Sequence, residues 1–163
     1  MQTFLPYPDY YRSCSCLDRQ RHGKQRIEAR TCAYLSLRRD SIGDFRNILK
    51  MSDKEAEYHW KRHRNHPAVK MWSGHVPSLL HYGIICCETW VEKGYRDNME
   101  LLLVNLYVEL RNKDNCSFIN PPWLGNELFH SSHRSNLLRK DPIHYGKFGW
   151  KEPNNLPYIW PIN

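Results

Sequence analysis

The sequence predicts an all-α fold, a compact single helical domain spanning residues 1–163 with an extended aromatic N-terminal arm and a C-terminal tail. Three observations support this. Apolar residues recur every three or four positions through most of the chain, and no segment alternates convincingly as a strand would. A length of 163 residues suits one domain with its own core. A composition of 40% hydrophobic and 13% aromatic residues is typical of a globular chain.

The first 40 residues should form an arm followed by a basic helix. Residues 1–16 are aromatic and contain proline, so we expect an irregular arm laid on the domain. The helical pattern begins at Leu17, with Asp18 placed as its N-cap. Gly23 costs this helix about 1 kcal/mol relative to alanine. It therefore marks either a close approach to the backbone or a boundary between loop and helix.

The middle of the chain should supply the core. The capping box "SDKE" at residues 52–55 predicts a short helix through Lys61. Pro67 can begin a new helix, and a long apolar stripe follows over residues 69–91. We expect this stripe to be one central helix, kinked at Pro77 and stopped by Gly94.

The last third should contain two further helices and a strap. Residues 99–110 form another amphipathic pattern, and "RNKDN" at 111–115 should turn the chain. The segment "NPPWLGNELFHSSHRSNLLRKDP" predicts a helix whose second half is basic. The tail "HYGKFGWKEPNNLPYIWPIN" is rich in aromatics and proline without a clear period, so we expect an extended strap on the surface.

The cysteines and the hydropathy pattern bear on location. The chain has no run of 18 apolar residues and no signal-peptide pattern at its N-terminus, so we expect an intracellular protein, in the cytoplasm or nucleoid, that does not associate with a membrane. The six cysteines are therefore expected to be reduced thiols. The alternative is a zinc site made by Cys14, Cys16 and Cys32, although C-x-C is shorter than the usual ligand spacing.

The charge is unevenly distributed. The net charge is +7, and residues 1–72 carry 15 Lys and Arg against 8 Asp and Glu, which accounts for the whole excess. Clustered cations of this kind indicate a nucleic acid or another acidic surface as the partner. A basic protein with no polyanion partner is the alternative.

The histidines allow a metal site, but no motif requires one. His63 and His66 lie close in sequence, and His130 and His133 are three residues apart, so these four could form a metal-dependent site. The sequence has no H-E-x-x-H, no G-x-S-x-G and no glycine-rich phosphate loop. Histidines flanked by arginine and lysine favour contacts with a polyanion instead.

Three segments carry a family resemblance. In order they are "LDRQRHGKQR", "HPAVKMWSGHVPSLLHYGIICCETWVEKGY" and "PPWLGNELFHSSHRSNLLRKDPIHYGKFGW". Together they resemble the pyrimidine-dimer DNA glycosylase superfamily, the endonuclease V type first known from a bacteriophage. The chain is most similar to a bacterial and viral branch that begins "MQTFLPY" and ends "LPYxWP", and this similarity covers nearly all of it.

The resemblance implies an all-α DNA repair enzyme that acts as a monomer on duplex DNA with damaged or modified bases. Such an enzyme flips a base beside the lesion and attacks the sugar C1′ with an amine, and it needs no cofactor or metal. An α-amino group ionises near 7.7–8.0 and a lysine side chain near 10.4, so a terminal amine has roughly 300-fold more of its neutral form at neutral pH. The amine of Met1 is therefore favoured over Lys24 or Lys140.

The sequence departs from the family pattern at the carboxylate. The family's catalytic carboxylate follows an arginine in the basic helix, and alignment places His22 or Gly23 there, with Glu28 the nearest carboxylate further on. The predicted catalytic residues are thus Met1, with Glu28 or His22 as acid/base or imine stabiliser. The predicted DNA-binding residues are Arg19, Arg21, Lys24, Arg26, Arg30, His133, Arg134, Arg139, Lys140, Trp150 and Trp160. A binding protein of this fold that has lost the chemistry, and that recognises a nucleic acid (DNA or RNA) or a modified nucleotide, is the principal alternative.

Overall fold

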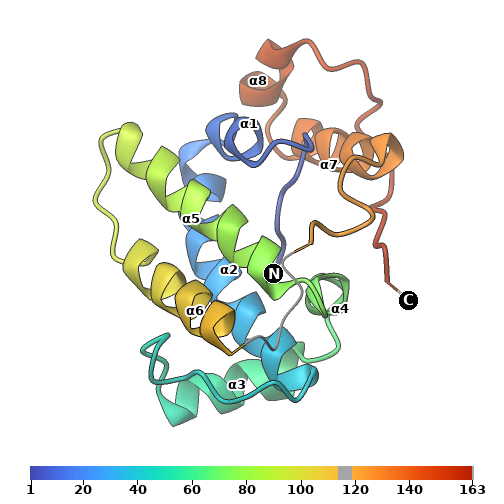
Figure 1. Ribbon diagram of the computed structural model, residues 1–163. Helices are drawn as coiled ribbons and strands as arrows, with labels where there is room; N and C mark the ends of the chain where they lie inside the picture. The colour runs from blue at the N-terminus through green and yellow to red at the C-terminus, as the bar shows by residue number, and fades with distance from the viewer. Residues whose placement is uncertain (114–118, 163) are drawn as a thin grey trace.

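The computed structural model describes residues 1–113 and 119–162, and within these ranges every regular element is a helix. The all-α prediction is confirmed (Figure 1). The predicted turn at residues 111–115 lies partly outside the described residues. The helices are α1 (Tyr10–Ser15), α2 (Arg19–Arg39), α3 (Asp53–His63), α4 (Pro67–Trp72), α5 (Val76–Glu92), α6 (Glu100–Asn112), α7 (Glu127–Lys140) and α8 (Pro142–Tyr145), followed by the 3-10 turn η1 (Gly146–Phe148).

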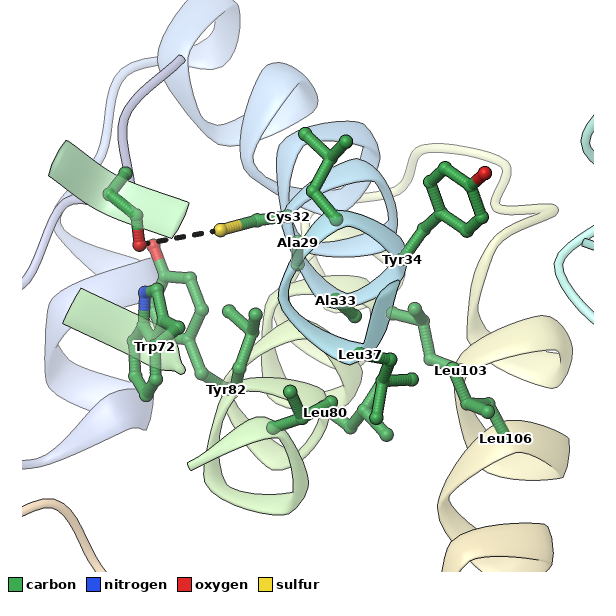
Figure 2. Close-up of a cluster of buried hydrophobic side chains, with 14 of the residues drawn as sticks. Ala29, Cys32, Ala33, Tyr34, Leu37, Trp72, Leu80, Tyr82, Leu103 and Leu106 are labelled. Carbon is green, nitrogen blue, oxygen red and sulfur yellow. Dashed lines mark hydrogen bonds between the residues drawn. The ribbon is translucent and has the colours of Figure 1, made fainter. Parts of the chain in front are cut away.

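The centre of the molecule is the packing of α5 against α2 on one side and α6 on another (Figure 1). Figure 2 shows the side chains that fill this contact, among them Leu80 of α5 and Leu103 of α6. Gly83 lies where the three helices meet. A Cβ atom added to Gly83 would be 2.8 Å from Ala29 Cβ and 2.8 Å from Leu103 Cδ1. The glycine therefore allows α2 and α6 to approach α5 together.

The predicted kinked helix over residues 69–91 is instead two helices. Helix α4 ends at Trp72 and α5 begins at Val76, with Gly74 at φ 76° between them. Pro77 lies in the first turn of α5, where the backbone N–H that it lacks would have no helical partner. The helix stops before Gly94, as predicted, and this glycine has φ 85°.

The helix starts agree with the capping residues in the sequence. The side chain of Asp18 accepts a hydrogen bond from the Arg21 backbone N–H at 3.1 Å, and Ser52 accepts one from Glu55 at 3.2 Å. Gly23 lies inside α2, and a Cβ there would be 3.1 Å from the Trp90 ring. Of the two explanations for this glycine, close approach is the correct one.

The prediction that all six cysteines are reduced is wrong for two of them. Cys14 of α1 and Cys86 of α5 form a disulfide across 72 residues of sequence, with their Cα atoms 5.3 Å apart. Helix packing creates this pairing, which the sequence spacing did not indicate. Cys16, Cys32 and Cys87 are free and buried, so the three cysteines of the zinc alternative do not form a common site.

The C-terminal strap is anchored to α7. After η1, residues 150–162 run without a helix, as predicted for most of the tail. Backbone N–H groups of Leu156 and Ile159 donate to Ser135 Oγ at 3.0 Å and Ser132 Oγ at 3.2 Å. In the described part of the chain, none of the helices has the length and apolarity that crossing a bilayer requires.

Candidate functional site

The N-terminal arm is threaded through the molecule instead of lying on its surface. Residues 3–6 are buried, and α1 forms within the segment that was predicted to be irregular. The arm runs antiparallel to α2, since Gln2 N–H donates to Glu28 Oε2 at 3.0 Å and Phe4 N–H donates to Gln25 Oε1 at 2.9 Å. Two acceptors one turn apart on α2 thus fix alternate residues of the arm.

Side chains from other helices hold the opposite edge of the arm. Each of these bonds satisfies a polar atom that the buried arm removes from water. The partners are Trp72 Nε1 on Thr3 Oγ1 at 2.9 Å, Tyr82 Oη on Phe4 O at 3.0 Å, His133 Nδ1 on Leu5 N at 3.1 Å, His130 Nδ1 on Leu5 O at 2.8 Å, and Arg134 Nη1 on Pro6 O at 2.8 Å.

A pocket of about 420 Å³ opens where the arm begins. Its lining includes the N-terminal residue and Glu28 of α2, so two of the three predicted catalytic residues lie together. The pocket is lined by Met1, Gln2, Phe4, Gln20, Arg21, Lys24, Gln25, Glu28, His66, Lys140, Tyr158 and Trp160.

Among the described residues that line this pocket, Glu28 is the only one with a carboxylate. Its burial raises its pKa, and this is opposed by the Gln2 N–H bond, the N-terminal ammonium, Lys24 and Gln25. A carboxyl group whose ionised and neutral forms are brought closer in free energy can both accept and return a proton. Glu28 therefore has the environment of an acid/base group.

Three cations predicted to bind DNA line the same pocket. Lys24 and Lys140 are exposed, whereas Arg21 is half-buried and paired with Asp18 at 2.7 Å. Arg19 and Arg139 are exposed but do not line the pocket. Cations around a pocket that holds an amine and a carboxylate can bind the phosphates on either side of a nucleotide.

His22 is not in the pocket. It is fully buried between α2 and α5, where Lys93 Nζ lies 3.0 Å from its Nδ1 and its Nε2 lies 2.9 Å from Cys86 O. Burial, reinforced by Lys93 and Arg26, lowers the pKa of His22 to about 4. Of the two acid/base candidates, the structure places only Glu28 beside Met1.

Three predicted DNA-binding arginines are used inside the fold. Arg26 pairs with Asp97 and lies over the Trp90 ring at 4.7 Å. Arg30 donates to Leu49 O at 2.8 Å and to Glu55 at 2.6 Å. Arg134, whose contact with Pro6 fixes the arm, also pairs with Glu127 and Glu152, and all three arginine side chains are buried. The periodic positive charge of α2 therefore serves partly as internal pairing.

The predicted histidine sets do not converge on a metal site. His130 and His133 are fully buried against the arm at Leu5, so His133 is not available to DNA, while His63 and His66 lie at the end of α3 and the start of α4. Within residues 1–113 and 119–162, no group of three or more potential ligands could hold a metal ion.

The tail aromatics divide between packing and the pocket. Trp150 stacks on Phe148 at 5.2 Å, and its Nε1 donates to Tyr7 Oη at 2.8 Å. Trp160 lines the pocket and lies edge-on to His66 at 5.9 Å. Tyr158, which the family resemblance also placed near DNA, lines the pocket as well, whereas sequence reasoning missed Gln25 and His66 as pocket residues. Only Gln25 had a signal, because it lies one turn before Glu28.

Comparison with known proteins identifies a family. The family model for pyrimidine dimer DNA glycosylase matches residues 1–103, and no curated protein or solved structure matches the chain. The matched range includes Met1, Lys24, Glu28 and His66, whereas Lys140 and the tail lie outside it. Because the match covers more than half of the sequence, the chain belongs to the pyrimidine dimer DNA glycosylase family.

Proposed function

We propose that this protein is a base-excision enzyme, a DNA glycosylase with AP lyase activity on damaged or modified pyrimidines in duplex DNA, and that it acts as a monomer. The observation that carries the proposal is the shared pocket of Met1 and Glu28, in which the N–H of the next residue, Gln2, lies 3.0 Å from the carboxylate. An amine and a carboxylate that share one pocket support this chemistry.

The chemistry uses the Met1 α-amine as the nucleophile. The amine nitrogen bonds to C1′ of the deoxyribose, the glycosidic bond breaks, and the base leaves with its electron pair and takes up a proton. The nitrogen lone pair then forms the C=N bond as C1′–O4′ breaks, and O4′ takes up a proton. A C2′ proton is then lost to solvent, and the electron pair of that C–H bond forms the C2′=C3′ double bond. The C3′–O3′ bond breaks, O3′ leaves on the phosphate with its electron pair, and the strand is cut by β-elimination.

Glu28 is the proton-transfer group of this sequence. It receives the proton that the amine loses on bond formation, and its raised pKa allows it to return a proton to O4′. As a carboxylate it also stabilises the positively charged iminium. Lys24, Lys140 and Arg21 hold the phosphates, and Trp160 offers a ring on which an exposed base can stack.

The test is borohydride trapping on duplex oligonucleotides that carry an abasic site or a thymine dimer. Borohydride reduces the iminium to a stable secondary amine, so the intact mass of the protein increases and peptide mapping locates the adduct. We expect it at Met1. The variants Lys24→Arg and Lys140→Arg should still form it, because neither lysine is the nucleophile. Salt-sensitive DNA binding without any adduct would instead support the non-catalytic binding protein.

A further inference from the structure

A hydrogen bond to the backbone holds His66 at the pocket and determines which ring nitrogen carries the hydrogen. It is the N-cap of α4, and its Nδ1 accepts the Ala68 backbone N–H at 3.1 Å. A neutral imidazole carries one N–H, so acceptance at Nδ1 places the hydrogen on Nε2. Within the described residues no hydrogen bond to the protein is formed by Nε2. His66 therefore brings a free N–H donor to a pocket that already contains Met1 and Glu28.

The surroundings keep this imidazole neutral. Burial lowers the pKa of His66, and the N-terminal ammonium and His63 lower it further. The His63 ring lies 6.3 Å away on the α3 side, and Lys24 of α2 and Lys140 of α7 add positive charge around the pocket. Within the described lining, only Glu28 opposes this charge with a carboxylate. Protonation would also put a hydrogen on Nδ1, which would break the bond from Ala68.

We propose that His66 contacts the substrate, donating its Nε2–H to an oxygen of the deoxyribose that the Met1 amine attacks. This inference rests on the proposed function. A neutral donor beside Trp160 suits a neutral sugar oxygen, whereas the exposed lysines that line the pocket suit the phosphates. O4′ gains negative charge as C1′–O4′ breaks, so the hydrogen bond strengthens at that step. His66 keeps its own proton throughout.

Two substitutions distinguish the role of Nδ1 as a helix cap from the proposed role of Nε2 as a hydrogen-bond donor to the substrate. His66→Asn retains an acceptor that can cap α4 but removes the donor at the Nε2 position, since asparagine is a favourable N-cap. His66→Gln places an amide N–H near the Nε2 position but loses the cap. His75→Asn is the matched control, because His75 also precedes a helix and lines a different pocket.

The readout is the rate constant of borohydride-trappable adduct formation on an abasic-site duplex, with enzyme saturating, between pH 6 and 9, together with the melting temperature. His66→Asn should melt close to the wild type but react at least about 10-fold more slowly, with an unchanged shape of the pH profile. His66→Gln should recover part of the rate and melt lower, and His75→Asn should react like the wild type.

Two results would overturn the role of His66. One is a wild-type rate in His66→Asn, which would mean that the donor does not touch the substrate. The other is the loss of one limb of the pH profile in that variant, which would make His66 a titrating base. Absence of an adduct in the wild type itself would be a failure of the proposed function, and the unsubstituted protein tests that separately.

Discussion

The backbone N–H of Gln2 donates to Oε2 of Glu28 at 3.0 Å, which holds the first residue of the chain against a half-buried carboxylate on α2. This contact is the last of several that run along the arm, because Phe4, Leu5 and Pro6 are each fixed by a different buried side chain. The position of the terminal amine is therefore determined by the core.

Replacing Glu28 with Gln should remove the chemistry and leave DNA binding. The amide keeps an oxygen for the Gln2 N–H but can neither accept the amine proton nor balance the iminium charge. We expect strand scission on an abasic-site duplex to fall by about 100-fold or more. The dissociation constant for uncleaved duplex should change little. Glu109→Gln on α6 is the control, and equal scission by Glu28→Gln and this control would reject the role of Glu28.

The same substitution should stabilise the protein at neutral pH. Burial raises the folded-state pKa of Glu28 above its unfolded value, so the unfolded chain gives up this proton first as the pH increases. The contribution of Glu28 to stability is thus present below the unfolded pKa and is lost as the pH increases through the folded pKa. Urea unfolding should show Glu28→Gln more stable than the wild type at pH 7 and similar to it at pH 4. A less stable variant at pH 7 would contradict this.

The exposed lysines of the pocket should determine the salt dependence of DNA binding. Each phosphate contact contributes about 0.9 to the slope of log affinity against log salt concentration for duplex DNA. Lys24→Ala and Lys140→Ala should each reduce this slope by about 0.9 without lowering the melting temperature, because both side chains are exposed. Lys54→Ala, on α3, is the comparison. If both lysine variants had the slope of the wild type, the DNA would not contact these lysines.

Arg30 should behave in the opposite way. Its guanidinium is buried and satisfies Leu49 O, Lys50 O and Glu55, so Arg30→Ala leaves two carbonyl groups and a carboxylate without this partner. We expect a loss of about 3 kcal/mol in the free energy of unfolding. The salt slope of DNA binding, measured below the unfolding transition, should remain that of the wild type. A reduced slope with normal stability would return Arg30 to the DNA interface.

The local features of the fold could be predicted from the sequence, but the partners of the buried charged side chains could not. Caps at Asp18 and Ser52 and the stop at Gly94 were predictable, since each depends on residues within one turn. The arginines of α2 recur with helical spacing both where they face solvent and where they pair with carboxylates inside the fold, so the spacing does not distinguish the two cases. Arg26 pairs with Asp97, 71 residues away, and no local pattern reports such a contact.

The candidate site shows the same division. The ionisation of a terminal amine favours Met1, and Glu28 is the nearest carboxylate beyond the position where alignment with the family expects one; both line the pocket. His22, the competing acid/base candidate, falls at that aligned position, but its side chain faces α5. His66 was considered only as a metal ligand, because its place beside Met1 depends on the packing of α4 against α2.

The disulfide between Cys14 and Cys86 should account for a large part of the stability. It closes 72 residues of sequence, and the loop-entropy relation gives about 4 kcal/mol for a loop of that length. Urea unfolding of the wild type under oxidising and reducing conditions should differ by about this amount. The double variant Cys14→Ala, Cys86→Ala should unfold like the reduced wild type and should not respond to reductant.

Loss of the disulfide should also slow the reaction in the pocket. Helix α1 directly follows the arm, and the disulfide ties it to α5, which carries the Tyr82 hydroxyl that contacts Phe4 O. Release of α1 removes one of the constraints on the arm and thus on the Met1 amine. We expect slower adduct formation in the double variant under conditions where it remains folded, with unchanged salt dependence of DNA binding. A wild-type rate would show that the hydrogen bonds of residues 2–6 are sufficient to position the amine.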